Sequence, residues 1–338
     1  MRKTVYSLPE LEWCDLTRYN DQQPAIVLTT PHAKIAAEYF LKQINLKEII
    51  YVQSSQKVDV NQITAKYVKA QVVYAIGGGR VIDIGRYLAS RWGLKIICIP
   101  TIISSDAFLV DCTGIRENGC VTYVPSKKAD RILLDWELLK KVPLKYHLSG
   151  CGDVLSIYTG VYDWKYVNKL GIASSDESYS QSVAITAKGI LDSLLSETEE
   201  IKKGTKKGLE ILITCLGMEV TLCNFFGNSR PEEGGEHFFT YCIENKIPRF
   251  LHGEMVCFGV LITSFLQKQP WRPLKKFMDT VGINYKPDGL TLEIILETLE
   301  EISDYVKIHN LRFSVYNNFL FKDYENKTKS FLKEIFKI

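Results

Sequence analysis

Short apolar runs alternate with amphipathic stretches through the first 150 residues of the chain. The runs that we predict to be strands are AIVLTT (25–30), EIIYVQSS (48–55), QVVYAI (71–76), KIICIP (95–100), GCVTYV (119–124) and DRILLD (130–135). Helical periodicity fills the intervals, most clearly over 31–42 and 81–92. Apolar strands that alternate with helices are typical of a parallel sheet with both faces covered. The pattern predicts an α/β fold for this part of the chain.

From about Pro143 the pattern changes, because long helical periodicities dominate to the C-terminus. A length of 338 residues is about twice that of a typical domain. We therefore predict an α/β domain with a parallel sheet over 1–149, followed by an all-α domain over 150–338. The active site is expected in the cleft between the two domains.

Composition narrows the possible functions. The net charge of +3 is small and the basic residues are scattered, which argues against binding to nucleic acid or to an acidic membrane. The apolar run 255–266 is too short to span a bilayer, and the N-terminus lacks a signal-peptide core. Nine irregularly spaced cysteines without a CxxC pair are typical of reduced thiols, not of a zinc–cysteine site. We expect a cytoplasmic protein without membrane insertion, and a homo-oligomer.

A glycine-rich turn is the first chemical signal. A buried strand runs into Gly77, Gly78 and Gly79, and a helix follows at once. Glycines let a phosphate approach the backbone, and a helix N-terminus offers N–H groups and partial positive charge. The pattern is not the GxGxxG fingerprint, so a tight strand–helix turn without a ligand remains an alternative.

The loop IPTIISSDAF (99–108) follows the next strand. In an open parallel sheet, ligands bind beyond the carboxyl ends of the strands. Thr101, Ser104 and Asp106 would share that edge with the glycine turn. A polar turn without a ligand is the simpler alternative.

Three potential metal ligands stand at predicted helix starts in the second half: Asp153, His237 and His252. Taken singly, a carboxylate there is favoured by the helix dipole, and a lone histidine is commonly a cap. Together, two imidazoles and a carboxylate leave an open position on Zn²⁺ or Fe²⁺. Such a metal beside a nicotinamide suits hydride transfer, because it polarises the C–O bond whose carbon exchanges hydride.

These motifs resemble, in order, those of the iron-containing alcohol dehydrogenase and dehydroquinate synthase superfamily, and most closely its glycerol-1-phosphate dehydrogenases. They are the GGGxVID turn, the PTxxSxDA loop, the GxGD helix start, SRPxxGxEH and LHGE, and they extend from about Pro24 to Gly259. The resemblance implies a Rossmann-like domain, a helical domain, NAD or NADP, and Zn²⁺, Fe²⁺ or another divalent metal. The implied reaction interconverts a small phosphorylated ketone and alcohol, such as dihydroxyacetone phosphate and sn-glycerol 1-phosphate.

The resemblance also implies roles for individual residues, carried over by position. The metal ligands are Asp153, His237 and His252. The nucleotide contacts are Gly77, Gly78, Gly79, Asp83, Thr101 and Ser104. The substrate contacts are Asp106, Arg230 and Tyr241, and the catalytic set is Asp106, Asp153 and Tyr241.

The chain departs from the family pattern around the substrate. SRPASGSEH becomes SRPEEGGEH, which adds Glu232 and Glu233, and Tyr241 replaces a substrate-contacting histidine. The usual SHDG loop is SSDA, as in glycerol dehydrogenases. Extra carboxylates near an anionic substrate are unfavourable unless they point away. A glycerol dehydrogenase-like polyol oxidoreductase is therefore one alternative function.

Two further alternatives are a sugar-phosphate cyclase of the dehydroquinate synthase type and a non-catalytic binding relative. The cyclase pattern has a glutamate as the metal-binding carboxylate and a Gly-Gly-Lys segment after the aspartate loop. This chain has Asp153 and LVDCTGIREN instead. A non-catalytic relative would be expected to lack a ligand, and none is missing.

The end of the second predicted strand bears on the choice of nucleotide. An acidic residue there binds the ribose hydroxyls of NAD and repels the 2′-phosphate of NADP. Here the strand ends in Ser54 and Ser55, followed by Lys57, with no acid until Asp59. We therefore predict that NADPH is used at least as well as NADH.

Overall fold

The computed structural model describes residues 7–66 and 69–337, which form two compact units. The first unit runs to Gly150 and includes Lys203–Thr221, and the second contains Cys151–Lys202 and the chain from Leu222 onward. Our prediction placed everything after residue 149 in one helical domain. The difference lies in the first part of helix α10 (Lys206–Phe226), which packs with the first unit. There the Lys206 ammonium lies 4.5 Å from the centre of the Trp13 ring.

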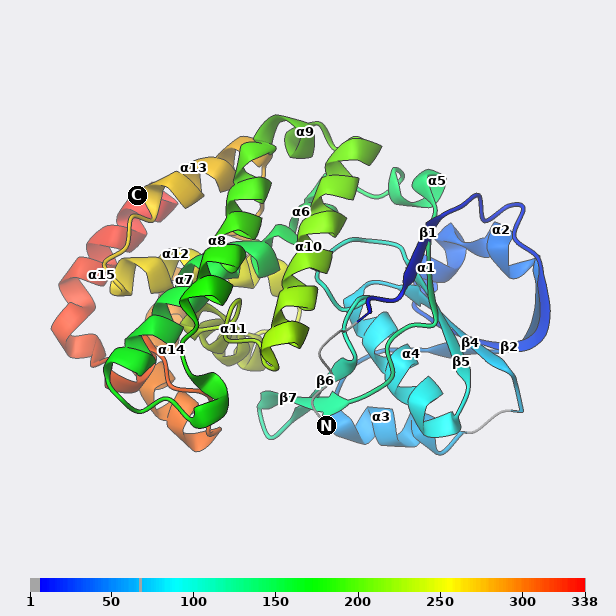
Figure 1. The fold of residues 1–338 in the computed structure, drawn as a ribbon, viewed down its shortest axis with the longest axis horizontal. Helices are drawn as coiled ribbons and strands as arrows, with labels where there is room; N and C mark the ends of the chain where they lie inside the picture. The colour runs from blue at the N-terminus through cyan, green and yellow to red at the C-terminus, as the bar shows by residue number, and fades with distance from the viewer. Residues whose placement is uncertain (1–6, 67–68, 338) are drawn as a thin grey trace. The chain divides into compact units, whose positions relative to one another are not determined.

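The first unit is built on a parallel sheet of six strands in the order β1-β8-β5-β4-β2-β3. Figure 1 labels β1, β2, β4 and β5 of this sheet. These strands are β1 (Glu10–Trp13), β2 (Asp21–Thr29), β3 (Ile44–Tyr51), β4 (Val72–Gly77), β5 (Lys95–Pro100) and β8 (Arg131–Leu134). The predicted α/β fold with a parallel sheet is confirmed. The strands from β2 onward follow the doubly wound order 2-1-3-4-5, and β1, which we did not predict, extends the edge beside β8.

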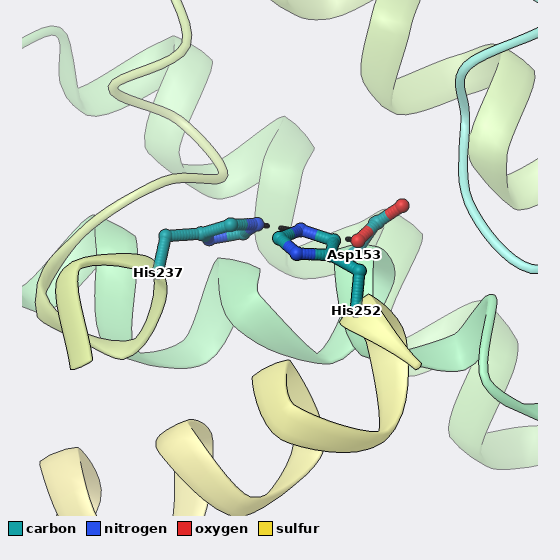
Figure 2. A group of neighbouring side chains, drawn as sticks. All are labelled: Asp153, His237 and His252. Atoms are coloured by element: carbon teal, nitrogen blue, oxygen red, sulfur yellow. Dashed lines mark ion pairs between the residues drawn. The ribbon is translucent and has the colours of Figure 1, made fainter. Parts of the chain in front are cut away.

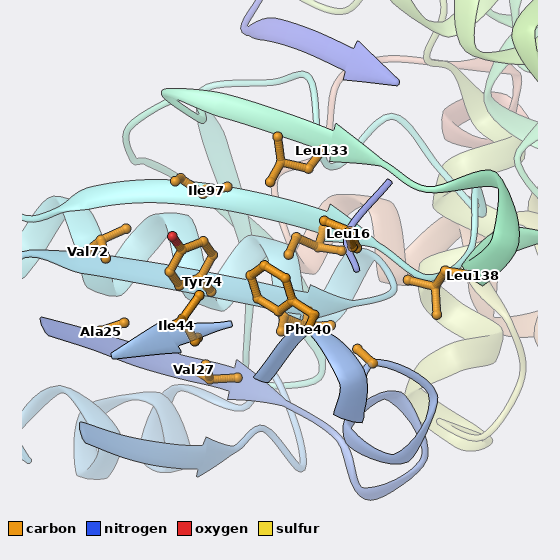
Figure 3. Packing of buried hydrophobic residues seen from close by; sticks show 13 residues of the cluster. Leu16, Ala25, Val27, Phe40, Ile44, Val72, Tyr74, Ile97, Leu133 and Leu138 are labelled. Carbon is orange, nitrogen blue, oxygen red and sulfur yellow. The ribbon is translucent and has the colours of Figure 1, made fainter. Parts of the chain in front are cut away.

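The central strands are buried on both faces, which explains their continuous apolar sequences. Alternate residues such as Val27, Val72 and Tyr74 point to one face, where they join a cluster that includes Phe40 (Figure 3). On the other face, α4 (Gly79–Trp92) packs against β4 and β5. The first unit therefore places the α4 N-terminus directly at the end of β4.

Three local features differ from the sequence prediction. The predicted strand at 119–124 is β7 (Cys120–Pro125), which pairs antiparallel with β6 (Cys112–Glu117) in a separate two-stranded sheet. The helix expected over 31–42 is divided into α1 (Pro31–Ala36) and α2 (Glu38–Leu41). Strand β3 ends at Tyr51, so the serines that we assigned to its end lie beyond it.

The remaining described elements are helical, as predicted for the second half. In the first unit they are α3 (Lys57–Thr64), α5 (Trp136–Leu139) and α6 (Leu144–Leu148). The second unit contains α7 (Cys151–Lys169), η1 (Ser175–Glu177), α8 (Gln181–Ser196), α9 (Thr198–Lys203), α11 (Gly235–Lys246), α12 (His252–Leu266), α13 (Arg272–Val281), α14 (Leu292–Ile308), η2 (Val315–Asn318) and α15 (Phe321–Phe336). Within the described chain, α10 is the one helix with the length and apolar composition to cross a membrane, although such a helix is also common in a protein core.

Helices α7, α11 and α12 form the centre of the second unit, and α12 packs against both of the others. Almost every residue of α12 is buried, which matches its nearly unbroken apolar sequence. The first turns of these three helices carry the residues that we predicted to be metal ligands.

Candidate metal centre and nucleotide site

The glycine turn lies at the point where the strand order of the first unit reverses. From β2 the chain passes to β3 on one side and then returns to β4 on the other, so the ends of β2 and β4 are neighbours. Ligands of doubly wound sheets bind outside the carboxyl ends of the strands at this position. The strand order therefore reverses between β2 and β4. This position accounts for a glycine turn after β4 in place of a GxGxxG motif after β2, the first strand of the series.

Side chains pack closely against all three glycines of the turn. A Cβ atom on Gly77 would lie 2.8 Å from Val81, one on Gly78 would lie 2.8 Å from Ile102, and one on Gly79 would lie 2.9 Å from the Ser105 hydroxyl. Gly78 is the N-cap of α4 and provides no side chain to bond the first N–H groups. The turn thus presents backbone at a helix N-terminus, as a phosphate-binding turn requires.

The second predicted nucleotide loop lies beside the turn. The Thr101 N–H donates to the Gly77 carbonyl oxygen at 3.0 Å, and Thr101 is buried. The Ser104 hydroxyl lies 4.0 Å from the position that a Cβ of Gly78 would occupy. The backbone carbonyl of Asp106 accepts from the Leu109 N–H at 2.7 Å, which fixes the end of this loop. The roles of Thr101, Ser104 and Asp106 toward ligands remain predictions.

Asp83 has partners within the first unit, and its role as a nucleotide contact remains a prediction. Its Oδ1 atom pairs with the Arg86 guanidinium at 2.5 Å, and its Oδ2 accepts from the Gly114 N–H at 3.4 Å. Arg86 is fully buried and also donates to the carbonyl oxygens of Val110 and Cys112 at 2.6 Å. The Asp83 carboxylate therefore anchors the β6–β7 hairpin to α4.

Asp153, His237 and His252 come together within the second unit (Figure 2). One possible ligand atom of each residue lies within 4.8 Å of the others, and Asp153 Oδ1 is 4.0 Å from His237 Nε2. Asp153 and His237 are buried, whereas the His252 side chain is 32% exposed. A partly exposed ligand group of this kind can bind a cation and remain accessible to a small molecule.

A close approach of two helices makes this grouping possible. A Cβ on Gly152 would lie only 2.6 Å from the Gly253 carbonyl oxygen and 3.1 Å from its Cα. Gly152 precedes Asp153 on α7, and Gly253 follows His252 on α12. The two glycines therefore let the backbones that carry these two groups meet directly.

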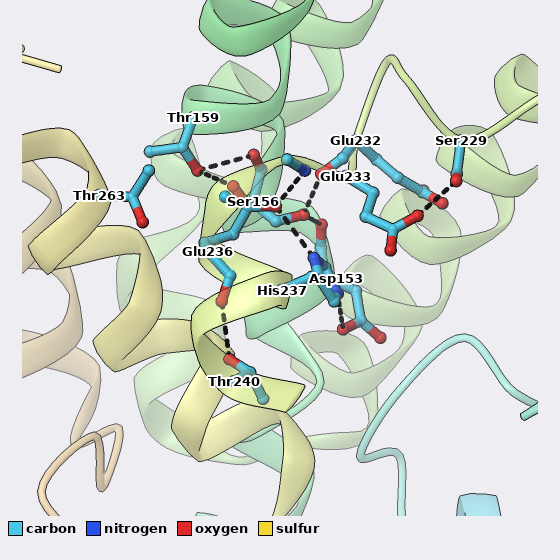
Figure 4. A network of polar contacts seen from close by, with 12 residues as sticks. Asp153, Ser156, Thr159, Ser229, Glu232, Glu233, Glu236, His237, Thr240 and Thr263 are labelled. Atoms are coloured by element: carbon cyan, nitrogen blue, oxygen red, sulfur yellow. Dashed lines mark hydrogen bonds and ion pairs between the residues drawn. The ribbon is translucent and has the colours of Figure 1, made fainter. Parts of the chain in front are cut away.

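Two glutamates that we did not predict orient the histidine rings. The His237 Nδ1 atom lies 3.0 Å from Glu236 Oε1, and the Thr159 hydroxyl donates to the other oxygen of this fully buried carboxylate at 2.6 Å (Figure 4). His252 Nδ1 lies 2.9 Å from Glu244 Oε1. A carboxylate at Nδ1 fixes the ring and leaves Nε2 for a metal. The sequence contains one feature that could have indicated this contact, because Glu244 lies two turns after His237 on the same helix.

The charges around His237 favour a cation. Burial by itself would lower the pKa of His237, but the hydrogen bond and charge of Glu236 raise it, and the charges of Glu233 and Asp153 add to this effect. The resulting pKa is about 9. The surroundings thus stabilise positive charge at the centre of the three groups. This electrostatic preference and the N, N, O donor set both fit a divalent ion.

Tyr241 lies against the two histidines. Its ring is stacked on His252 with 14° between the planes and 6.2 Å between the ring centres, and it is 6.0 Å from the His237 ring. The Tyr241 hydroxyl donates to Glu233 Oε1 at 2.8 Å. The position suits the predicted role toward substrate, which remains a prediction.

Glu233 is held from its other side by Arg312, a residue that sequence reasoning missed. Its Oε2 atom accepts from the Ser229 hydroxyl at 2.6 Å and forms a short ion pair with Arg312. Burial on its own would raise the pKa of Glu233, but Arg312 and His237, with hydrogen bonds from Ser229 and Tyr241, lower it to about 2. The added carboxylate thus points toward Tyr241, and an internal arginine compensates its charge.

Arg230 does not present its charge to a substrate, contrary to our prediction. Its side chain is 1% exposed, pairs with Glu177 at 2.9 Å and donates to the Phe313 carbonyl oxygen at 2.9 Å. The guanidinium thus ties the segment before α11 to η1 and to the chain that precedes η2. Arg312, at 24% exposure, is the more accessible cation of this region.

Comparisons with known proteins show which family the chain resembles. Residues 20–143 match the model of the iron-containing alcohol dehydrogenase family. The chain is 29% identical over 293 residues to a Pyrococcus abyssi protein named glycerol-1-phosphate dehydrogenase (NAD(P)+), with 84% of each chain covered. It is also 29% identical over 238 residues to the protein of that name from Aeropyrum pernix. That match spans 68% of this chain and 65% of the relative, slightly under two thirds of its length.

Solved structures show the same fold. The glycerol dehydrogenase of Schizosaccharomyces pombe aligns with a TM-score of 0.70 at 18% identity, over 99% of this chain and 93% of that one. An iron-containing alcohol dehydrogenase aligns with a TM-score of 0.61 at 13% identity, over 89% and 91% of the two chains. The resemblance predicted from the motifs is confirmed.

Proposed function

We propose that this chain, a glycerol-1-phosphate dehydrogenase-like member of the iron-containing alcohol dehydrogenase superfamily, is a metal-dependent NAD(P)H oxidoreductase. Its substrates are a small phosphorylated ketone and the matching alcohol, most like dihydroxyacetone phosphate and sn-glycerol 1-phosphate. The observation that carries the proposal is the grouping of Asp153, His237 and His252 within 4.8 Å. The names of the relatives and the glycine turn at the switch point support it.

In this proposal, Asp153, His237 and His252 hold a divalent ion, and the turn at Gly77–Gly79 holds the phosphates of the nucleotide. The bound ion and nucleotide would supply, respectively, polarisation of the substrate C–O bond and a hydride. Glu236 and Glu244 keep the two imidazoles oriented with Nε2 toward the ion. Tyr241 lies within reach of a molecule beside the histidines, and Asp106 is proposed to orient the substrate near the nicotinamide.

We propose Zn²⁺ as the ion, with Fe²⁺ as the main competitor, because two imidazoles and one carboxylate suit both. We further propose a cytoplasmic homo-oligomer that binds neither nucleic acid nor membrane. None of the cyclase features named above appears in the sequence, so hydride transfer is preferred to cyclisation.

The proposed function is tested by following NADH and NADPH oxidation with a panel of ketones after loading the protein with Zn²⁺ or Fe²⁺. We expect turnover with dihydroxyacetone phosphate or a close analogue, and its loss on removal of the metal by a chelator. Absence of turnover with every ketone and both metals would refute the proposal. Retention of full turnover after complete metal removal would refute the metal-dependent mechanism alone.

The structure changes the premise of the predicted nucleotide preference. Asp59 accepts a short hydrogen bond from the Ser54 hydroxyl, so an acid does lie just beyond β3. Lys57, expected to offset a 2′-phosphate, instead pairs with Glu117 at 2.8 Å in an exposed contact. Exposed pairs contribute little, so Lys57 can exchange partners, but Asp59 would still repel the phosphate. We therefore propose NADH as the preferred nucleotide.

Replacing Asp59 by asparagine is expected to raise the ratio of kcat/KM with NADPH to that with NADH by about tenfold, because one repulsive charge is removed. Steady-state kinetics at matched ionic strength measure the ratio. The control is Glu117→Gln, which releases Lys57 but leaves Asp59 in place. A ratio in Asp59→Asn equal to that of the wild type would exclude Asp59 from the ribose site.

A further inference from the structure

Four charged side chains form a compact cluster in the second unit: Glu177, Arg230, Glu233 and Arg312. We refer to them as the charge cluster. Arg230 pairs with Glu177 at 2.9 Å, Arg312 Nε lies 4.0 Å from the same carboxylate, and Arg312 pairs with Glu233. Two cations balance two anions, so the cluster as a whole offers no net positive charge to a phosphate.

Glu233 is the member of the charge cluster that reaches the candidate metal centre. It is 8% exposed, and Tyr241, which donates to its Oε1 atom, is stacked on His252. The pKa of about 2 means that the carboxylate is ionised at neutral pH. A fixed negative charge therefore stands one side chain away from the histidines.

The hydrogen bond to Glu233 also determines what Tyr241 can offer to another molecule. A phenol has one proton to donate, and here that proton is directed to the carboxylate. Toward a ligand, the tyrosine oxygen then offers lone pairs, which accept a hydrogen bond from a hydroxyl group. A histidine at this position, as is common in the family pattern, could donate to the substrate instead.

We infer that Glu233 is a specificity-determining residue, which through Tyr241 favours a substrate hydroxyl and disfavours an anionic group beside the His237–His252 pair. The inference rests on the proposed function, and it concerns which ketones the site prefers. The charge of Glu233, which Arg312 partly offsets, would reduce the use of dihydroxyacetone phosphate relative to a neutral ketone without preventing it.

The test compares Glu233→Gln with the wild type, both loaded with metal. Glutamine has nearly the same shape and retains a carbonyl oxygen for the Tyr241 hydroxyl, so the change removes mainly the charge. We expect the ratio of kcat/KM for dihydroxyacetone phosphate to that for dihydroxyacetone to rise about tenfold, since a unit charge at this range acts on the dianion far more than on the neutral ketone.

Glu177→Gln is the matched control. It removes a carboxylate from the same charge cluster, next to the same Arg312, but the Tyr241 hydroxyl donates to Glu233, whereas Glu177 pairs with the buried Arg230. The variant should therefore leave the ratio within twofold of the wild type. Tyr241→Phe is the second test variant, because it keeps all four charges and removes the accepting oxygen. In that variant the ratio should rise through a higher KM for dihydroxyacetone.

Metal content and thermal unfolding of each variant show whether it is folded and loaded. A wild-type protein that reduces neither ketone would refute the proposed function. A wild-type protein that is active, with a ratio unchanged in folded Glu233→Gln, would overturn the present inference alone. If Glu233→Gln does not fold or does not bind metal, the same ratio measured for Tyr241→Phe tests the inference instead. An unchanged ratio in Tyr241→Phe would then overturn the inference.

Discussion

Replacing His252 by alanine is expected to lower turnover by roughly a thousandfold or more, because the proposed metal centre, which would activate the substrate carbonyl, would lose one of its three ligands. His252 begins α12, its ring is 32% exposed, and Glu244 holds its Nδ1 atom. Removal of an exposed ring at a helix start leaves no large void in the core, so the fold should persist. Metal content per chain, circular dichroism and NADH oxidation measure the three consequences.

The control is His309→Ala in the same unit. His309 ends α14, and its ring packs on Tyr305 with 4.4 Å between the ring centres, far along the chain from the ligands. This variant should bind metal and turn over as the wild type does. Full activity of His252→Ala at wild-type metal content would show that this histidine is not a ligand.

The second large effect is expected for Gly152→Ala. The added Cβ would lie 2.6 Å from the Gly253 carbonyl oxygen, and a backbone atom cannot move aside as a flexible side chain can. We expect the free energy of unfolding of the metal-free protein to fall by about 1–3 kcal/mol. Metal affinity should fall as well, since separation of α7 from α12 moves Asp153 away from His252. Denaturant unfolding and competition with a chelator measure the two quantities.

Gly189→Ala provides the matched comparison, because a Cβ on Gly189 in α8 meets nothing within 4 Å. In an exposed helix interior this change should stabilise the protein by roughly 0.5–1 kcal/mol. If the two variants were equally stable, the close contact between α7 and α12 would have no energetic importance.

The sequence predicted most of the sheet because its central strands are buried on both faces and are therefore continuously apolar. The edge strand β1 escaped prediction, since its residues Glu10–Trp13 are only partly buried and polar positions interrupt the pattern. Strand β6 escaped for a similar reason, because Gly114 and Arg116 make it unlike a core strand.

For the candidate site, the grouping of Asp153, His237 and His252 and the position of the glycine turn could be predicted because each stands in a recognisable local pattern. The partners of these residues could not. Arg312 meets Glu233 across 79 residues of sequence, and Arg230 turns inward to Glu177 across 53 residues. Which arginine is buried depends on tertiary packing that local patterns do not encode. The same limit applies to Asp83, whose partner is decided by the position of the β6–β7 hairpin.

The three proposed ligands come from the first turns of α7, α11 and α12, and all of them belong to the second unit. A cation bound there ties together segments that are 84 and 15 residues apart in the sequence (153 to 237 and 237 to 252). Binding to the native arrangement and not to the unfolded chain adds to folding stability as the logarithm of the free ion concentration. Each tenfold increase above the dissociation constant is worth about 1.4 kcal/mol. The concentration of free metal in the cell would then determine the stability of the second unit as well as the rate of turnover.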